Sequence, residues 1–355
     1  DLAPVPALLA LLAVRPDLAD RALPAYAVGL GTNIALGEAL GFAHYDAGWH
    51  ATSTIGPLAG AAALSHLLGL DAAATRSALA LAAAQAGGFQ RNFGTMAKHV
   101  QAGQAAAAGL RAALMAEAGI EADADIFGPK GYLDLYAGAV PGRPVSEIVV
   151  QPDTLSVSRK LFPCCYLTHR MIGAALKAHR LLPDGIPAAS KVIVEVPYGG
   201  LVPLRVSDPQ TGAEAKFCAA YCVATALLQG RVGLSDFTEA AVHRPQVRQL
   251  MGQVETREDP LDGPVPVGID HGTVRLRIME GNRCLAETEL RSYPGAPEAP
   301  LPEAEFAAKL DDCLAIGRAE TGEDLAPQTF MSALAARLDP PVAAPASAAS
   351  SLAHA

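Results

Sequence analysis

The stretch from Gly41 to Gly103 constrains the fold of this 355-residue chain more than any other. A glycine- and threonine-rich turn with His44 and His50 precedes two helical runs of small residues, and a second irregular segment follows, ending around Lys98. An imidazole or ammonium group buried between helices must find a polar partner, so two polar clusters beside apolar helices are a costly way to build a purely structural bundle. The pattern predicts a helical scaffold that carries a binding site.

The composition supports closely packed helices. Hydrophobic residues make up 51% of the chain but aromatic residues only 5%, so small side chains must dominate the helix contacts. Apolar residues recur every three or four positions in several segments, with Asp71 placed as an N-cap. The helices predicted in this way are 5–14, 22–40, 52–68, 72–84 and 99–118.

The period changes near residue 155, where we place a domain boundary. SKVIVEVP alternates like a strand, and GTVRLRIM and RCLAETEL, separated by EGN, are typical of a β-hairpin. Helical patterns between and after these segments predict further helices at 214–228, 236–251, 303–316 and 328–338. We expect a helical domain over 1–155, an α+β domain over 156–300, C-terminal helices over 301–340 and a low-complexity, disordered tail over 341–355.

The net charge of −9 and the pI near 5.5 argue against a nucleic-acid partner, which needs clustered Lys and Arg. Six cysteines without a dense disulfide pattern favour a reducing, cytoplasmic compartment. No uncharged apolar run is long enough for a membrane helix, and the start lacks the basic region of a signal peptide. The chain begins with Asp rather than Met, so we expect it to be the remainder of a longer polypeptide.

Three sets of residues could carry chemistry. His44 and His50 lie within seven positions of one turn, where neutral imidazole can move a proton and imidazolium can bind a carboxylate. Arg91, Lys98 and His99 lie within nine positions at a loop-to-helix junction, which favours anions. A solvated surface lysine and a core histidine are the structural alternatives, and the residues alone leave both open.

The third set is RKLFPCCYLTH, where Cys164 or Cys165 could form a nucleophilic pair with His169. The apolar context favours packing for both cysteines. Tyr221 lies on a predicted helix and, from its surroundings alone, belongs to the core.

Five ordered motifs carry a resemblance that covers almost the whole chain. GWHATSTIGPLAGAAALSHLLGLD, FGTMAKHVQAG, GPKGYL, KLFPCCYLTH and AEAKFCAAYCVATALLQGRVGLSDF together resemble the MmgE/PrpD family. That resemblance implies a mainly α fold, in which a large all-helical domain carries an inserted, smaller α+β lid domain and receives the C-terminal helices. It also implies an active site between the two domains, no metal or organic cofactor, and a homodimer.

The resemblance assigns catalytic roles to His50, Lys98, Lys160 and Tyr221, with the lysines neutralising carboxylates and His50 or Tyr221 handling protons. Candidate substrate contacts in the same segments are His44, Arg91, Thr95 and His169. The family includes 2-methylcitrate dehydratase, cis-aconitate decarboxylase and iminodisuccinate epimerase. We therefore expect a cofactor-independent lyase for a small di- or tricarboxylate, with dehydration of a citrate-like acid such as 2-methylcitrate first and epimerisation of a dicarboxylate as the alternative.

Two departures from the family pattern qualify this expectation. An acidic motif of the form HALDFDD, which relatives carry nearer their N-terminus, does not occur in this sequence. The chain could accordingly be a fragment, receive that motif from another polypeptide, or be an inactive homologue. The other departure is Cys165, which stands where some members have histidine and favours dehydration over decarboxylation.

Overall fold

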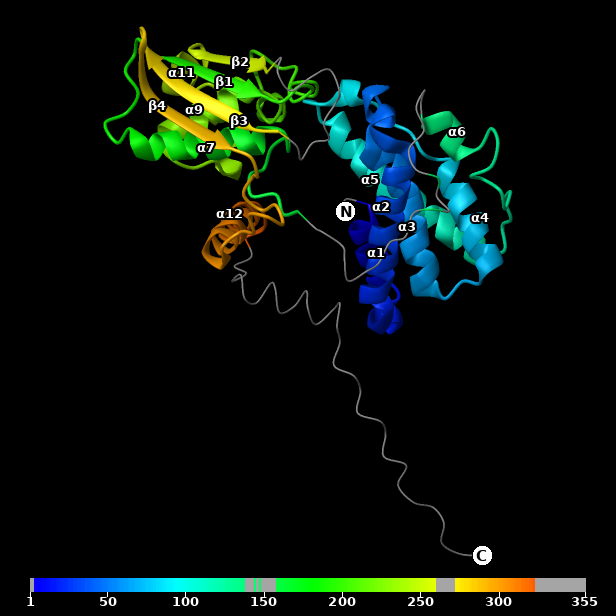
Figure 1. Ribbon diagram of the computed structural model, residues 1–355. Coiled ribbons are helices and arrows are strands. Elements are labelled where there is room, and N and C mark those ends of the chain that lie inside the picture. Colours follow the sequence, from blue (N-terminus) through cyan, green and yellow to red (C-terminus); the bar gives the residue numbers. More distant parts are fainter. Residues whose placement is uncertain (1–2, 138–143, 145–146, 148–157, 260–271, 323–355) are drawn as a thin grey trace, which may run out of the picture.

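The computed structural model describes residues 3–137, 144, 147, 158–259 and 272–322 (Figure 1). Within them the chain is mainly helical and forms two parts with separate hydrophobic cores, which we call the helical domain (3–137) and the α/β domain (158–322). The boundary predicted near residue 155 lies outside the described residues.

The helical domain contains six α-helices among its described residues. They are α1 (Pro4–Leu12), α2 (Ala22–Asp46), α3 (Ala51–Leu68), α4 (Ala72–Ala83), α5 (Ala97–Glu117) and α6 (Tyr132–Tyr136), with 3-10 turns η1 (Pro16–Arg21) and η2 (Gln90–Asn92). The helices predicted from periodicity are confirmed, and Asp71 caps α4 by accepting a hydrogen bond from Ala74 N at 2.8 Å. Helix α6 falls in a segment for which periodicity predicted no helix.

Helix α3 lies at the centre of this domain and packs against both α2 and α5. Small residues permit the close packing: a Cβ added at Gly109 of α5 would lie 2.8 Å from Pro57 O and 2.9 Å from Ala61 N of α3. Helix α3 is therefore buried on nearly every side, and its N-cap residue His50 is buried too.

Helix α2 is kinked where the sequence predicted its end. Gly41 has a φ of 62°, and the following short helical piece runs to Asp46. Because a residue with a side chain rarely adopts this conformation, Gly41 redirects the chain toward the turn that contains His50.

The α/β domain contains a four-stranded sheet covered by helices. Its strands are β1 (Lys191–Val196), β2 (Val254–Glu258), β3 (Val274–Glu280) and β4 (Arg283–Leu290), in the order β2-β1-β3-β4. Its helices are α7 (Thr168–Leu181), α8 (Gly212–Ala215), α9 (Ala219–Gln229), α10 (Glu239–Val242), α11 (Pro245–Met251) and α12 (Glu303–Thr321), with the 3-10 turn η5 (Leu234–Phe237).

The predicted strand and hairpin are confirmed as β1, β3 and β4, with β3 antiparallel to both neighbours. Strand β2 was missed because its five residues, VETRE, have little apolar alternation; it pairs parallel to β1. The buried side chains of β1 and β3 pack against α7 and α9, which form the core of this domain. Figure 1 shows α7 and α9 on one face of the sheet.

The two long helices predicted at 214–228 and 236–251 are wrong as continuous elements. The first is divided between α8 and α9, where Cys218 begins a new helix as its N-cap. The second is divided among η5, α10 and α11, because Pro245 cannot continue a helix and instead begins α11. The breaks place Lys216 and Phe217 in a short connection rather than on a helix surface.

Helix α12 contacts the rest of the α/β domain: Lys309 Nζ donates to Lys160 O at 2.6 Å, and Asp312 Oδ2 accepts from Leu234 N at 2.7 Å. The return of the C-terminal helices to the helical domain, and the insertion of the α/β domain within it, stay predictions. The predicted helix at 328–338 and the tail over 341–355 lie outside the described residues. Among the described helices, none combines the length and the apolar character needed to cross a bilayer.

Candidate active site

The turn that contains His50 is fastened to the loop before Lys98. His50 N donates to Gly88 O at 3.0 Å, and Gln90 N donates to Gly48 O at 2.9 Å. Gly88 has a φ of +143°, and a Cβ there would lie 2.1 Å from Ser53 Oγ, so only glycine permits this approach. The two polar clusters of the sequence are therefore one structural unit.

His50 is 4% exposed and fixed in one tautomer. Its Nδ1–H donates to Gln101 Oε1 at 2.8 Å, while the Gln101 amide nitrogen donates to Phe89 O at 3.5 Å and so orients the amide. Burial, reinforced by the charge of Lys98, lowers the pKa of His50 to about 4, against the bond to Gln101. At neutral pH the imidazole is uncharged and no hydrogen bond from the described residues occupies Nε2, so this nitrogen can accept a proton.

Lys98, in the first turn of α5, lies over two aromatic rings. Its Nζ is 5.3 Å from the centroid of Phe93 and 5.5 Å from that of Phe217, and the two rings are stacked at 5.4 Å. Phe93 also contacts the His50 ring edge-on at 5.1 Å. Because Phe93 belongs to the helical domain and Phe217 to the α/β domain, these contacts place Lys98 and His50 at the junction of the two.

Further cations reach this junction from the α/β domain. Cys165 N donates to Lys216 O at 2.9 Å, which joins the segment before α7 to the connection between α8 and α9. Burial lowers the pKa of Lys98, and the charges of Lys160 and Lys216 lower it further, while Cys165 acts in the opposite direction. The charges of Lys160 and Lys216 thus act on Lys98 at the junction, and we call these three residues the lysine cluster.

No carboxylate within the described ranges forms a salt bridge with the lysine cluster. Three ammonium groups brought together without counter-charges repel one another, and an anionic ligand would remove that repulsion. The described residues also contain no group of three His, Cys, Asp or Glu side chains arranged to hold a metal ion. The resemblance-based expectation of a cofactor-free site stays a prediction.

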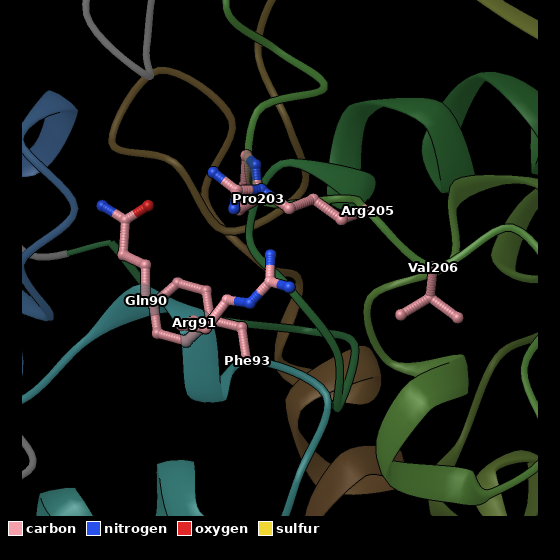
Figure 2. A pocket seen from close by; sticks show the side chains of 6 residues that line it. All are labelled: Gln90, Arg91, Phe93, Pro203, Arg205 and Val206. Atoms are coloured by element: carbon pink, nitrogen blue, oxygen red, sulfur yellow. The ribbon is translucent and has the colours of Figure 1, made fainter.

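A pocket of about 180 Å³ adjoins the lysine cluster through Phe93 (Figure 2). Its walls come from both domains: Gln90, Arg91 and Phe93 on one side, and Pro203, Arg205 and Val206 on the other. The predicted contact residue Arg91 is thus at the domain junction, whereas the exposed Thr95 uses its hydroxyl to donate to Asn92 O at 2.8 Å.

The structure places His44 in the helical core instead of at the junction. Its Nδ1–H donates to Tyr136 O at 2.7 Å, its Nε2 accepts from Thr54 Oγ1 at 2.8 Å, and the side chain is 2% exposed. Burial lowers its pKa, which favours the neutral ring. With both nitrogens occupied, His44 has no atom free for substrate, so the structural alternative describes it better than the predicted binding role.

Tyr221 and His169 lie in the core of the α/β domain, and both are fully buried. The Tyr221 hydroxyl donates to Asp236 O, which holds η5 against α9. His169 contacts the rings of Phe162, Tyr166 and Tyr293, and neither of its ring nitrogens has a hydrogen-bond partner among the described residues. The catalytic role of Tyr221 and the binding role of His169 stay predictions, to be tested by substitution.

Sequence reasoning missed Lys216, Phe217, Gln101 and Arg205. The first two stand in the AEAKF motif that carried part of the resemblance, but they were assigned to a helix rather than to a connection. Arg205 is in an irregular segment with no local signal, and only the packing of the two domains brings it opposite Arg91.

Comparison with known proteins identifies two family domains in this chain. Residues 3–142 match the MmgE/PrpD N-terminal domain, and residues 162–326 match the MmgE/PrpD C-terminal domain. Cis-aconitate decarboxylase from Homo sapiens is 30% identical over 250 residues, covering 66% of this chain and 50% of its own length. Cis-aconitate decarboxylase from Aspergillus terreus is 28% identical over 306 residues, covering 79% of this chain and 61% of its own.

The chain thus spans between half and about three fifths of these relatives' lengths. Both family domains match in the expected order, on either side of the junction that holds His50 and the lysine cluster. The chain belongs to the MmgE/PrpD family.

Proposed function

We propose that this chain forms the site of a lyase that acts on a small tricarboxylate related to citrate and cis-aconitate. The observation that carries the proposal is the lysine cluster, which forms no salt bridge with a described carboxylate and whose Lys98 shares the Phe93 ring with the buried His50. Names of relatives add support, since both cis-aconitate decarboxylases act on a substrate of this class.

The geometry supports chemistry through a carbanion next to a carboxylate. Carboxylates of the substrate would bind Lys98, Lys160 and Lys216, whose positive charges stabilise the negative charge that develops when a bond to the adjacent carbon breaks. The stacked rings of Phe93 and Phe217 exclude water from one side of Lys98, which strengthens that stabilisation. The junction of two domains would thus serve as the active site, with the α/β domain as its cover.

Dehydration is the first candidate reaction, because the free Nε2 of His50 suits a base. It would take the proton from the carbon next to a carboxylate, and the electron pair would form the double bond as hydroxide leaves and is protonated to water. A 2-methylcitrate-like hydroxy acid fits this step. Burial raises the pKa of Cys165 to about 11, so the thiol stays protonated and does not supply a second base.

Decarboxylation of cis-aconitate is the second candidate, favoured by the relatives' names. Here the bond to one carboxylate breaks, CO₂ leaves, and the electron pair left on carbon takes a proton. Neutral His50 would first have to gain a proton, or the protonated Cys165 thiol would donate one. Dehydration thus uses His50 as a base, whereas decarboxylation needs a proton donor.

The test is an assay of the purified chain with 2-methylcitrate, citrate and cis-aconitate, following the unsaturated product by ultraviolet absorbance and CO₂ release separately. We expect turnover of at least one acid and a loss of about 100-fold in kcat/KM for Lys98→Gln. Lys191→Gln removes an exposed lysine paired with Glu255 on the sheet and is the matched control. Absence of turnover with all three acids, or equal effects of both variants, would contradict the proposal; proton exchange into solvent without net reaction would indicate an epimerase instead.

A further inference from the structure

Two arginines face each other across the pocket of about 180 Å³ at the domain junction. Arg91 extends from η2 of the helical domain, and Arg205 extends from the segment after β1 of the α/β domain. Figure 2 shows both side chains reaching toward the space between the two segments, with Phe93 beside Arg91. A single water needs only about 10–15 Å³, so this space can hold a small anion.

Neither guanidinium has a carboxylate partner among the described residues, and both side chains are exposed. Arg205 Nε donates to Val202 O at 3.0 Å, which holds the side chain while its two terminal nitrogens remain available to a ligand. A planar guanidinium pair is well matched to a carboxylate, which can accept two parallel hydrogen bonds from one fork.

The pocket and the lysine cluster share Phe93. This ring lines the pocket, and the same ring lies under Lys98 Nζ at 5.3 Å. A Cβ added at the neighbouring Gly94 would lie 3.5 Å from Val206 Cγ2, so the loop of the helical domain packs directly against the pocket wall of the α/β domain. A ligand bound by the lysine cluster therefore has a second cationic site next to it.

We propose that Arg91 and Arg205 bind the carboxylate of the substrate most distant from the lysine cluster and thereby select tricarboxylates over dicarboxylates. This inference rests on the proposed function for the identity of the ligand. Because the two arginines belong to different domains, a carboxylate between them bridges the domains, whereas a dicarboxylate with both of its carboxylates on the lysine cluster has none left for the arginines.

The experiment is equilibrium binding of citrate and of malate to the purified chain by titration calorimetry, for wild type, Arg91→Gln and Arg205→Gln. We expect each variant to lose about 10- to 100-fold in affinity for citrate, as for a lost charged hydrogen-bond pair, and to change affinity for malate by less than about twofold. Arg205→Lys should recover only part of the loss, because lysine cannot form the two-pronged contact.

Arg76→Gln is the matched control, since Arg76 is an exposed arginine on α4, which lies on the side of the helical domain away from the sheet (Figure 1). Equal losses for citrate and malate, no loss for either, or an equal loss in the control would overturn the inference. Failure of the wild-type chain to bind citrate at millimolar concentration would also overturn the inference. Citrate binding that depends on both arginines in a chain without turnover would contradict the lyase proposal while supporting the inference.

Discussion

A buried histidine has different hydrogen-bond partners in the helical core and at the domain junction. His44 and His50 are six positions apart and almost equally buried, at 2% and 4% exposed. In the core, both nitrogens of His44 have hydrogen-bond partners, Tyr136 O and Thr54 Oγ1. At the junction, His50 has a partner among the described residues for Nδ1 only, Gln101 Oε1. Between these two histidines, the difference that distinguishes the candidate base from the structural residue is a ring nitrogen without a partner, and not burial.

Charged side chains show the same contrast. In the α/β core, the buried Asp236 is paired with Arg231 at 3.3 Å and with Arg244 at 3.0 Å. At the junction, Lys98 has aromatic rings and other lysines around it. The core is arranged for stability, whereas the junction retains repulsion that a ligand can relieve.

The largest expected effect is on the core histidine. His44→Ala should lower the free energy of unfolding by about 3 to 4 kcal/mol, because it opens a cavity and leaves Tyr136 O and Thr54 Oγ1 without partners. Urea denaturation measures the loss. Citrate affinity of the folded variant should stay within about twofold of wild type, and a large selective loss of affinity would remove the contrast with His50.

A smaller effect is expected from the pH dependence of stability. The pKa of His50 is lowered to about 4, so as pH falls below about 6.5 the unfolded chain binds a proton before the folded chain does. The contribution of neutral His50 to the free energy of unfolding is fully present above pH 6.5. It is lost as the pH falls toward 4, up to about 2 to 3 kcal/mol.

His50→Gln should abolish that part of the slope when unfolding by urea is compared at pH 7 and pH 4.5. His66→Gln, at an exposed position of the same helix, is the control and should retain the wild-type slope. If His50→Gln and wild type lose equal stability over this range, His50 is not held neutral as described.

The smallest effect is a gain of stability at the junction. Lys98→Met should raise the free energy of unfolding by about 1 kcal/mol, because it removes a partly buried charge repelled by Lys160 and Lys216 and retains the contact with Phe93. The shift in thermal midpoint measures it, with Lys191→Met as control. A loss of stability would show that the ammonium group of Lys98 is satisfied in the free protein.

Local sequence patterns determined a large part of the secondary structure of this protein. Helices α1, α3, α4 and α5, the Asp71 cap, strand β1 and the β3–β4 hairpin follow from periodicity and capping, which act within a few residues. Five motifs were sufficient for the family, and the same motifs marked His50, Lys98 and Lys160 as site residues.

Only the tertiary structure decided which of the marked residues face one another. His44 and His50 share one turn in the sequence, and long-range hydrogen bonds to Tyr136 and Gln101 give them different surroundings. The sequence already indicated a core position for Tyr221, and the tertiary structure added Asp236 O as the partner of its hydroxyl. Arg91 and Arg205, 114 positions apart in the sequence, line one pocket only because the two domains pack together. Side-chain partners from distant segments fix protonation and charge pairing, and no local pattern contains that information.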